Sequence, residues 1–87
     1  MYFIVQHRHD YSTCHAHNPE SIQAMGDVVT SAATHNITIH GHFGNRLEHT
    51  NYYIIEAISM EDVDALFEPV LELGDWEITP VIKKLTS

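Results

Sequence analysis

The sequence predicts one small α+β domain whose elements follow the order βαββαβ, the ferredoxin-like arrangement. The chain has 87 residues, which is enough for one hydrophobic core and not for two. Two segments carry apolar residues at spacings of three and four, as amphipathic helices do. Four short segments rich in β-branched and aromatic residues flank them, as strands do. We therefore treat residues 1–87 as a single domain.

The first strand and the first helix are separated by a polar segment. Residues 2–9 (YFIVQHRH) predict a strand, and residues 10–18 (DYSTCHAHN) lack any period and predict a loop. Asn18-Pro19-Glu20 then supplies an N-cap, a proline at the first helical position and an early acidic charge. The helix is expected to run to about His35, with an apolar stripe made of Ile22, Met25, Val28, Val29 and Ala32 or Ala33.

The middle of the chain predicts two consecutive strands. Residues 37–43 (ITIHGHF) alternate between apolar and polar at period two, and residues 49–57 form the second strand. Gly44-Asn45 lies between them and predicts the turn of a hairpin.

The last third of the chain predicts a helix and a final strand. Ser59 is the expected N-cap, and Pro69 predicts a kink or an early end of the helix. Gly74 closes the helix, and residues 76–82 (WEITPVI) alternate as a strand. The expected apolar face of this helix consists of Val63, Leu66, Phe67, Val70 and Leu71.

The order of these elements fixes the expected topology. A βαββαβ chain forms an antiparallel sheet with strand order 4-1-3-2, and both helices cover one face of it. The other face needs cover as well, so we expect a homodimer.

Composition excludes some classes of partner. The formal net charge of −8, with only four basic residues, argues against binding DNA or RNA through phosphate groups. No stretch approaches the roughly 18 apolar residues of a membrane span, and the N-terminus lacks the features of a secretory signal, so a cytoplasmic location is expected. The single cysteine, Cys14, is expected to be a free thiol, a metal ligand or an intermolecular link.

Eight histidines in so short a chain predict a metal site. In the expected sheet, one end collects the close of the first strand, the loop after it, the end of the second strand and the start of the third. His7 and His9 are two apart on one strand, so both side chains should project from the same face, and His40 and His42 repeat this spacing. The candidate metal ligands at this end are His7, His9, Cys14 and His49, with His15, His17 and His42 as alternatives.

Imidazole and thiolate ligands suit transition metals, of which zinc or copper is the first expectation, followed by iron or nickel. The expected function is therefore that of a transition-metal-binding protein, whose ion is structural, stored, sensed or catalytic. No motif of an established enzyme family occurs, so whether the chain is an enzyme stays open. Three alternatives remain: a metal-independent barrel enzyme with a histidine base, of monooxygenase or isomerase type, a haem-binding barrel, and an interaction module in which the histidines have no special role.

The segments Glu48–Ala57 (EHTNYYIIEA) and Gly74–Ile82 (GDWEITPVI), within the whole-chain pattern of elements, resemble those of the small dimeric α/β-barrel proteins. Among these, the DUF3303-type proteins of unknown function are the nearest. The resemblance implies a ferredoxin-like protomer whose sheet packs against a second sheet across a two-fold axis. That superfamily includes cofactor-free monooxygenases, haem-binding proteins, lyases and isomerases. The similar sulfur oxygenase reductases hold mononuclear iron, so the resemblance is compatible with metal chemistry.

Overall fold

The structure is a computed structural model that describes residues 1–10 and 18–85 of the chain. Its elements, in chain order, are β1 (Tyr2–Arg8), α1 (Pro19–Ser31), η2 (Ala32–His35), β2 (Thr38–Asn45), β3 (Thr50–Glu56), α2 (Met60–Phe67), η3 (Glu68–Leu73) and β4 (Asp75–Val81), where η denotes a 3₁₀-helix. None of the helices in these residues is long and apolar enough to cross a membrane.

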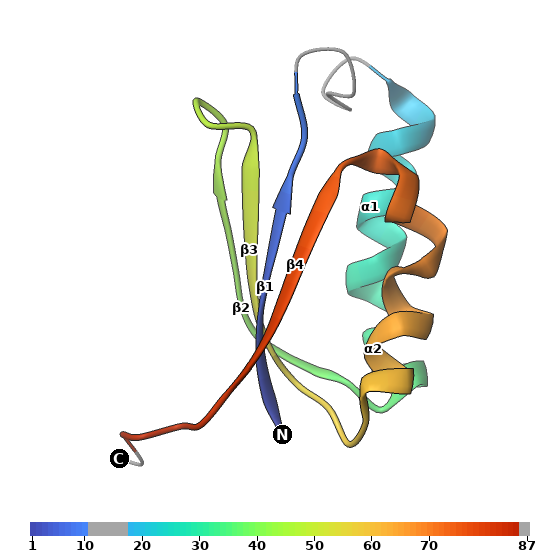
Figure 1. Ribbon diagram of the computed structural model, residues 1–87. Coiled ribbons are helices and arrows are strands. Elements are labelled where there is room, and N and C mark those ends of the chain that lie inside the picture. The colour runs from blue at the N-terminus through green and yellow to red at the C-terminus, as the bar shows by residue number, and fades with distance from the viewer. Residues whose placement is uncertain (11–17, 86–87) are drawn as a thin grey trace.

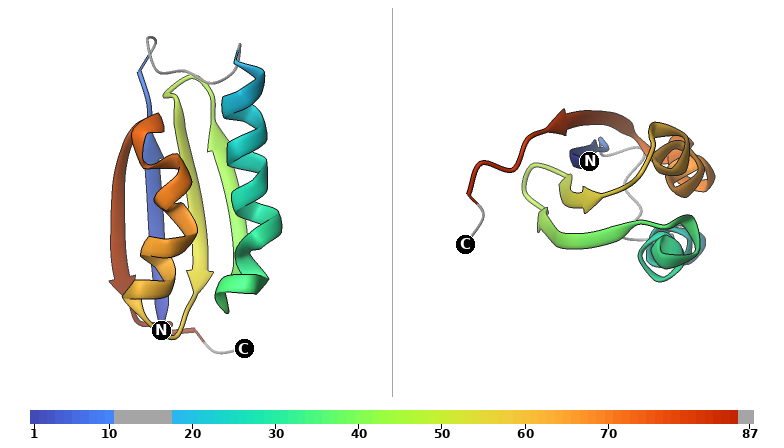
Figure 2. Two further views of the ribbon diagram at one scale, coloured as in Figure 1. Left: turned by 90° about the vertical axis from the view of Figure 1, so that its right-hand side faces the viewer. Right: turned by 90° about the horizontal axis from the view of Figure 1, so that it is seen from below.

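The four strands form one antiparallel sheet with the order β2-β3-β1-β4. This is the predicted order 4-1-3-2 counted from the other edge. Both helices lie on the same face of the sheet, and the opposite face is uncovered (Figures 1 and 2). The order and the single helical layer are those of the ferredoxin-like fold, as the sequence predicts.

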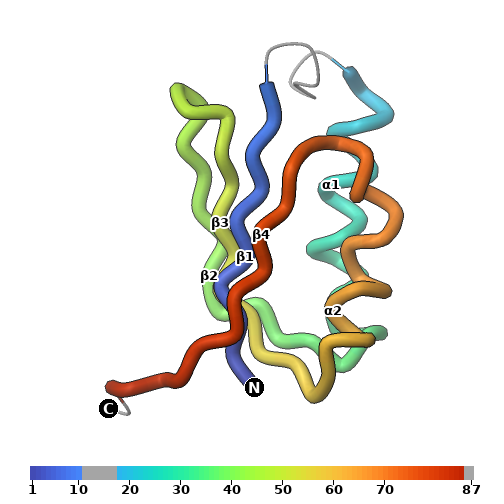
Figure 3. The backbone as a smooth tube through the Cα atoms, viewed as in Figure 1, coloured from blue at the N-terminus to red at the C-terminus, as the bar shows by residue number. Residues whose placement is uncertain are grey.

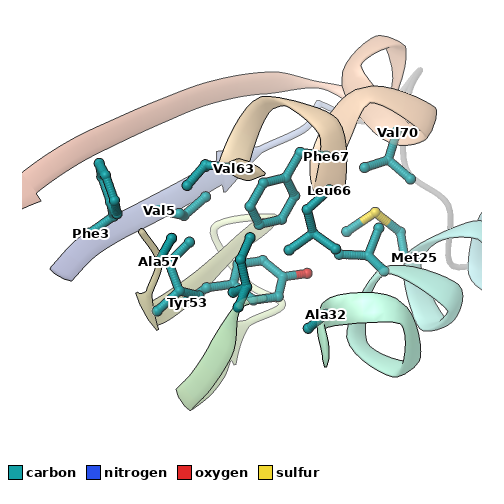
Figure 4. Packing of buried hydrophobic residues seen from close by; sticks show 13 residues of the cluster. Phe3, Val5, Met25, Ala32, Tyr53, Ala57, Val63, Leu66, Phe67 and Val70 are labelled. Atoms are coloured by element: carbon teal, nitrogen blue, oxygen red, sulfur yellow. The ribbon is translucent and has the colours of Figure 1, made fainter. Parts of the chain in front are cut away.

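The core lies between the helices and the sheet. Its largest fully buried side chains include Tyr53, Phe3 and Phe67, which come from two strands and from α2 (Figure 4). Helix α1 contributes Met25 and Val28, while Ile22 and Val29 of the predicted stripe are largely exposed. The helix therefore buries a narrower stripe than the sequence pattern indicates.

Side-chain caps mark the starts of both helices, and a proline marks the end of α2. The Asn18 side chain accepts hydrogen bonds from the amides of Glu20 and Ser21, and the Ser59 hydroxyl accepts one from the amide of Asp62, which satisfies donors that the first helical turn leaves unpaired. The α-helical part of the second helix ends at Phe67 and tightens into a 3₁₀ segment at Pro69, which confirms the predicted early end.

The predicted turn at Gly44-Asn45 is wrong, because β2 continues through both residues and the chain turns at residues 46–49. Asn45 pairs with Thr50 across the hairpin, and its side-chain oxygen accepts hydrogen bonds from the amides of Leu47 and Glu48. An asparagine that accepts from amides two and three residues ahead builds an Asx-type turn after itself. The residue is thus the last of the strand and not the turn.

A β-bulge in β2 overturns the expectation that His40 and His42 project from one face. The pairing of β2 with β3 skips a residue between Ile39 and Gly41. His40 then lies on the open face, where its Nε2 is 2.9 Å from Glu56 Oε1, whereas His42 lies on the helix side and stacks on Tyr53. One extra residue on the bulged strand changes the face of every side chain that follows it.

The open face of the sheet carries an apolar patch. Ile4 of β1 pairs with Ile54 of β3, and the next rung places Tyr52 beside Phe43 of β2. The exposed fractions are 42% for Ile4, 38% for Ile54 and 60% for Phe43. We call these four residues the open-face cluster.

Candidate functional site

His9 and His49 lie together at the end of the sheet where β1 ends and β3 begins. The His9 amide donates a hydrogen bond of 3.0 Å to the carbonyl oxygen of His49, which extends the pairing of the two strands by one step. The two imidazole rings have centroids 5.0 Å apart and planes at 88° to each other. Figure 3 shows the β2–β3 turn and the end of β1 at this same end of the sheet. Two imidazoles are therefore held edge to face by the backbone.

The turn that carries His49 holds it in an unusual backbone conformation. His49 has φ 51°, in the left-handed region that few residues other than glycine occupy; asparagine, aspartate and histidine are the most frequent of these. Its amide donates to Arg46 O, and the neighbouring Thr50 hydroxyl donates to the Glu48 carbonyl oxygen. Such a conformation costs on the order of 1 kcal/mol or more and persists where the surroundings impose it.

The carboxylate of Glu48, the neighbour of His49, has a partner inside the turn. Asn45 Nδ2 donates a hydrogen bond of 3.2 Å to Glu48 Oε1. This bond stabilises the turn that presents His49, so the clearest contribution of Glu48 to the site is to hold that turn.

His7 is fully buried, and hydrogen bonds engage both of its ring nitrogens. Nε2 donates to the Leu73 carbonyl oxygen at 2.9 Å, and Nδ1 lies 3.4 Å from Asn51 Nδ2 and accepts from it. These partners assign the proton to Nε2, because a carbonyl oxygen only accepts. The His7 ring also stacks on Trp76, with centroids 4.3 Å apart, and lies 5.4 Å from the His9 ring. The arrangement makes His7 a support for His9.

Seven aromatic rings follow one another in contact from the middle of the sheet to this end. The distances between successive ring centroids are 4.3, 5.5, 4.9, 4.3, 5.4 and 5.0 Å. Two of the six contacts are stacked, two are tilted and two are edge-to-face. Stacked and edge-to-face contacts are favoured geometries for aromatic pairs. We call this series the ring row; in order, it consists of His42, Tyr53, Phe67, Trp76, His7, His9 and His49.

The sequence pattern predicts His42 near the end of its strand, and this prediction is wrong because β2 continues to Asn45. His42 pairs with Tyr53, which pairs in turn with Val5, four residues before His9. At about 3.3 Å per residue, His42 is therefore roughly 13 Å along the strands from His9. Partial burial lowers the pKa of His42.

The other candidates, Cys14, His15 and His17, lie outside the described residues. Within residues 1–10 and 18–85, no group of three or more His, Cys, Asp or Glu side chains is arranged to hold a metal ion. The structure thus brings together His7, His9 and His49 of the candidates and separates His42 from them.

A surface hollow of about 310 Å³ adjoins His9 and contains carboxylates that are not among the ligands predicted from the sequence. It is lined by Arg8, His9, Asp10, Glu72, Gly74 and Asp75. Three carboxylates against one guanidinium give this end of the sheet a negative potential, which favours a cation over an anion. Glu72 lies two residues before Gly74, and Asp75 directly follows it. The sequence signal that could have identified these two carboxylates is their closeness to a glycine that brings the chain back against β1.

Gly74 permits the close approach of η3 and β4 to the end of β1. Its φ of 154° belongs to a region that is essentially restricted to glycine. A Cβ at this position would lie 2.5 Å from Arg8 O and 2.6 Å from His7 Nε2. The glycine therefore leaves the space in which the His7 ring reaches Leu73.

Buried Tyr53 provides a test of the ring row that needs no ligand. Its side chain is fully buried, Tyr53 Oη has no hydrogen-bond partner among the described residues, and burial raises the pKa of Tyr53 to about 12. In the unfolded chain a tyrosine ionises near pH 10, so stability is expected to fall as pH rises from about 10 to 12, by about 2 to 3 kcal/mol. Urea denaturation between pH 8.5 and 11.5 measures this loss.

The matched variants separate Tyr53 from general alkaline effects. Tyr53→Phe is expected to remove most of this pH dependence and to equal or exceed the parent in stability at pH 8, because it removes a buried hydroxyl. Tyr52→Phe, on the open face, is expected to leave the dependence in place. Equal slopes for the parent and Tyr53→Phe would contradict the assignment.

Comparison with known proteins supports the fold of this chain and gives no information on its function. No protein-family model and no curated protein matches the chain. Among solved structures, the crystal structure of SCO4226 from Streptomyces coelicolor A3(2) is similar, with a TM-score of 0.66 over 100% of both chains and 21% sequence identity. At this identity the likeness shows the fold alone. The resemblance to DUF3303-type proteins stays a prediction.

Proposed function

We propose that this protein binds a transition-metal ion at the end of the sheet, with His9 and His49 as the first two ligands. The observation that carries the proposal is the orthogonal imidazole pair, held by the hydrogen bond between the His9 amide and the His49 carbonyl oxygen. The strained backbone of His49 supports it, because a residue held at positive φ at a cost in stability suggests a use for its side chain. The negative potential of the adjoining hollow favours a cation.

Two imidazoles are half of the four ligands that zinc takes in a closed structural site. The remaining positions are assigned by the proposal to Cys14 and to His15 or His17, which follow His9 by five to eight residues in the sequence. Water in one position would make the site open to a substrate. Zinc or copper is the first expectation, and iron or nickel follow. The proposal gives His7 the role of positioning His9 and not of binding the metal, since its ring nitrogens already form hydrogen bonds with Leu73 and Asn51.

Elemental analysis by mass spectrometry of untagged protein, purified without added metal, is the first test. The parent is expected to carry near-stoichiometric metal, and the His9→Ala, Cys14→Ala, His49→Ala triple variant to carry none. In titrations, each single variant is expected to lose more than about 100-fold in affinity. His35→Ala and His40→Ala serve as controls and should bind as the parent does.

The pH dependence of binding adds an independent check. Imidazole and thiol must lose protons to bind a metal ion, so affinity should fall as pH falls through about 6. Trp76, the single tryptophan, stacks on His7 next to His9, so its fluorescence reports on the site during the titration. A parent that stays empty when offered zinc, copper, iron and nickel, or an affinity that is flat from pH 8 to pH 5, would contradict the proposal.

The strain at His49 predicts opposite effects of one substitution on stability and on binding. His49→Asn is expected to raise the unfolding free energy of the metal-free protein by up to about 1 kcal/mol, because asparagine tolerates the left-handed region. The same variant should lose the metal. Asn36, at φ 58°, is the other non-glycine residue with positive φ among those described, so Asn36→His is the reverse control and should destabilise by a similar amount.

Urea denaturation in the presence of a chelator measures both variants. If His49→Asn is less stable than the parent without metal, then the His49 ring serves packing against His9, and the strained backbone gives no support to the metal site. A metal titration of His49→Asn tests separately whether the variant has lost the metal.

We further propose that the protein forms a homodimer through the open face of its sheet. The open-face cluster supports this, because apolar side chains on three neighbouring strands form a contiguous patch (Ile4, Phe43, Tyr52 and Ile54). Gly41 belongs to the same patch, and the Phe43 ring lies over it, so that a Cβ there would be 2.7 Å from the ring. A patch of this kind with a polar rim is typical of a protein interface.

A further inference from the structure

The residues that follow β4 form an extended arm. Residues 82–85 leave the sheet after Val81 and project away from the helices, on the side of the open face (Figures 1 and 2). Ile82 and Leu85 are 85% and 78% exposed, so their apolar side chains are almost uncovered by their own chain. The arm therefore extends toward the space that a second sheet would occupy.

The root of the arm is fixed to the open face. Val81 pairs with Tyr2 at the start of β1, and Lys83 Nζ lies 5.8 Å from the centre of the Tyr2 ring. An ammonium group over an aromatic ring is a favourable contact. Tyr2 in turn lies beside the His40 ring, whose Nε2 contacts Glu56. The direction of the arm is thus set by contacts at this end of the sheet.

The charges of the arm and of the open face are complementary. Lys83 and Lys84 are two of only four basic residues in a chain with twelve acidic ones. Asp75 and Glu77 lie on the open face of β4, because they pair with Arg8 and Gln6 of β1, which alternate with the buried residues of that strand. These two acids are at the opposite end of the sheet from the root of the arm.

We propose that residues 82–85 of each copy clasp the open sheet face of a second copy in the homodimer proposed above, on which this inference rests. Ile82 and Leu85 cover the edge of the partner's open-face cluster, and Lys83 and Lys84 meet the partner's Asp75 and Glu77. Because the arm leaves one end of the sheet and the two acids lie at the other, this pairing requires the two sheets to face each other with their strands running in opposite directions.

Sedimentation equilibrium of the full chain tests the clasp and the dimer separately. The parent is expected to be a dimer, and Ile54→Asp in the centre of the face a monomer. Ile82→Ser with Leu85→Ser should weaken dimerisation by at least about 10-fold, since buried apolar anchors carry most of the energy of an interface. These arm residues are exposed in the single chain, so the double variant should retain the parent's circular dichroism spectrum.

Charge reversal tests the orientation of the clasp. Lys83→Glu with Lys84→Glu should weaken the dimer at low salt, and adding Asp75→Lys with Glu77→Lys to the same chain should restore it. Ile22→Asp, on the exposed side of α1, is the matched control and should leave the dimer unchanged. A parent that is monomeric at 100 µM overturns both the dimer and the clasp. A dimer that the arm substitutions leave unchanged overturns the clasp alone, and a failure of the compensating pair overturns the antiparallel orientation.

Discussion

Gly74→Ala is expected to destabilise the protein by on the order of 3 kcal/mol or more. The new methyl group would lie 2.5 Å from the backbone oxygen of Arg8 and 2.6 Å from His7 Nε2, and it would occupy a backbone conformation, φ 154°, that alanine avoids. The backbone oxygen cannot move without breaking the β1–β4 ladder. The His7 ring cannot move without leaving Leu73. Urea denaturation monitored by Trp76 fluorescence measures the loss.

Gly26→Ala is the matched control for this experiment. Gly26 lies within α1, and a Cβ there would have no atom within 4 Å, so alanine should raise stability by about 0.5 to 1 kcal/mol through its higher helix propensity. If the two alanine variants had similar stabilities, the close approach of the chain to β1 would not depend on the absence of a side chain at Gly74. The contrast between the variants thus isolates the close approach from any general effect of removing a glycine.

His7→Ala is expected to cost about 3 kcal/mol. It removes a fully buried side chain, leaves the part-buried Leu73 carbonyl oxygen and Asn51 amide without this partner, and opens a space beside the Trp76 ring. Each buried polar group left without a partner costs about 1 to 3 kcal/mol, and the cavity adds to this. The same variant should shift the Trp76 emission, because the indole loses the ring on which it stacks.

His40→Ala is the control for His7→Ala. His40 is an exposed histidine whose contacts are with Tyr2 and Glu56 on the open face, and surface substitutions of this kind change stability by less than about 0.5 kcal/mol. An equally small effect for His7→Ala, with unchanged Trp76 emission, would show that the His7 ring is not a support of this end of the sheet.

The sequence pattern was sufficient for the topology, since period and element order do not depend on fine detail. The strands predicted over residues 2–9 and 76–82 are observed as Tyr2–Arg8 and Asp75–Val81, and Asn18 and Ser59 cap helices that begin where expected. Pro69 ended the α-helix of α2 as predicted, because its missing amide removes a helical hydrogen bond at that point. These are local rules that the tertiary structure did not override.

The candidate site was predicted only in part, because it depends on register. The sequence shows that His40 and His42 are two residues apart, but the bulge after Ile39 puts them on opposite faces. Nor does the sequence show that β2 extends to Asn45, which moves His42 away from the end of the strand. His9 and His49 were correctly expected at one end, because each directly adjoins a strand whose limits the pattern located to within a residue or two.

The ring row has a consequence for how substitutions combine. Seven side chains from all four strands or their ends, from α2 and from the turn at 46–49 touch in series, so each interior ring has a neighbour on both sides. When one ring is replaced by a smaller side chain, its neighbours shift. A second replacement then leaves a different cavity from the one that it would leave in the parent protein. Free energies measured for single replacements along the row will therefore not sum to those of pairs. The change in unfolding free energy caused by one substitution in the ring row therefore depends on which other rings of the row are present.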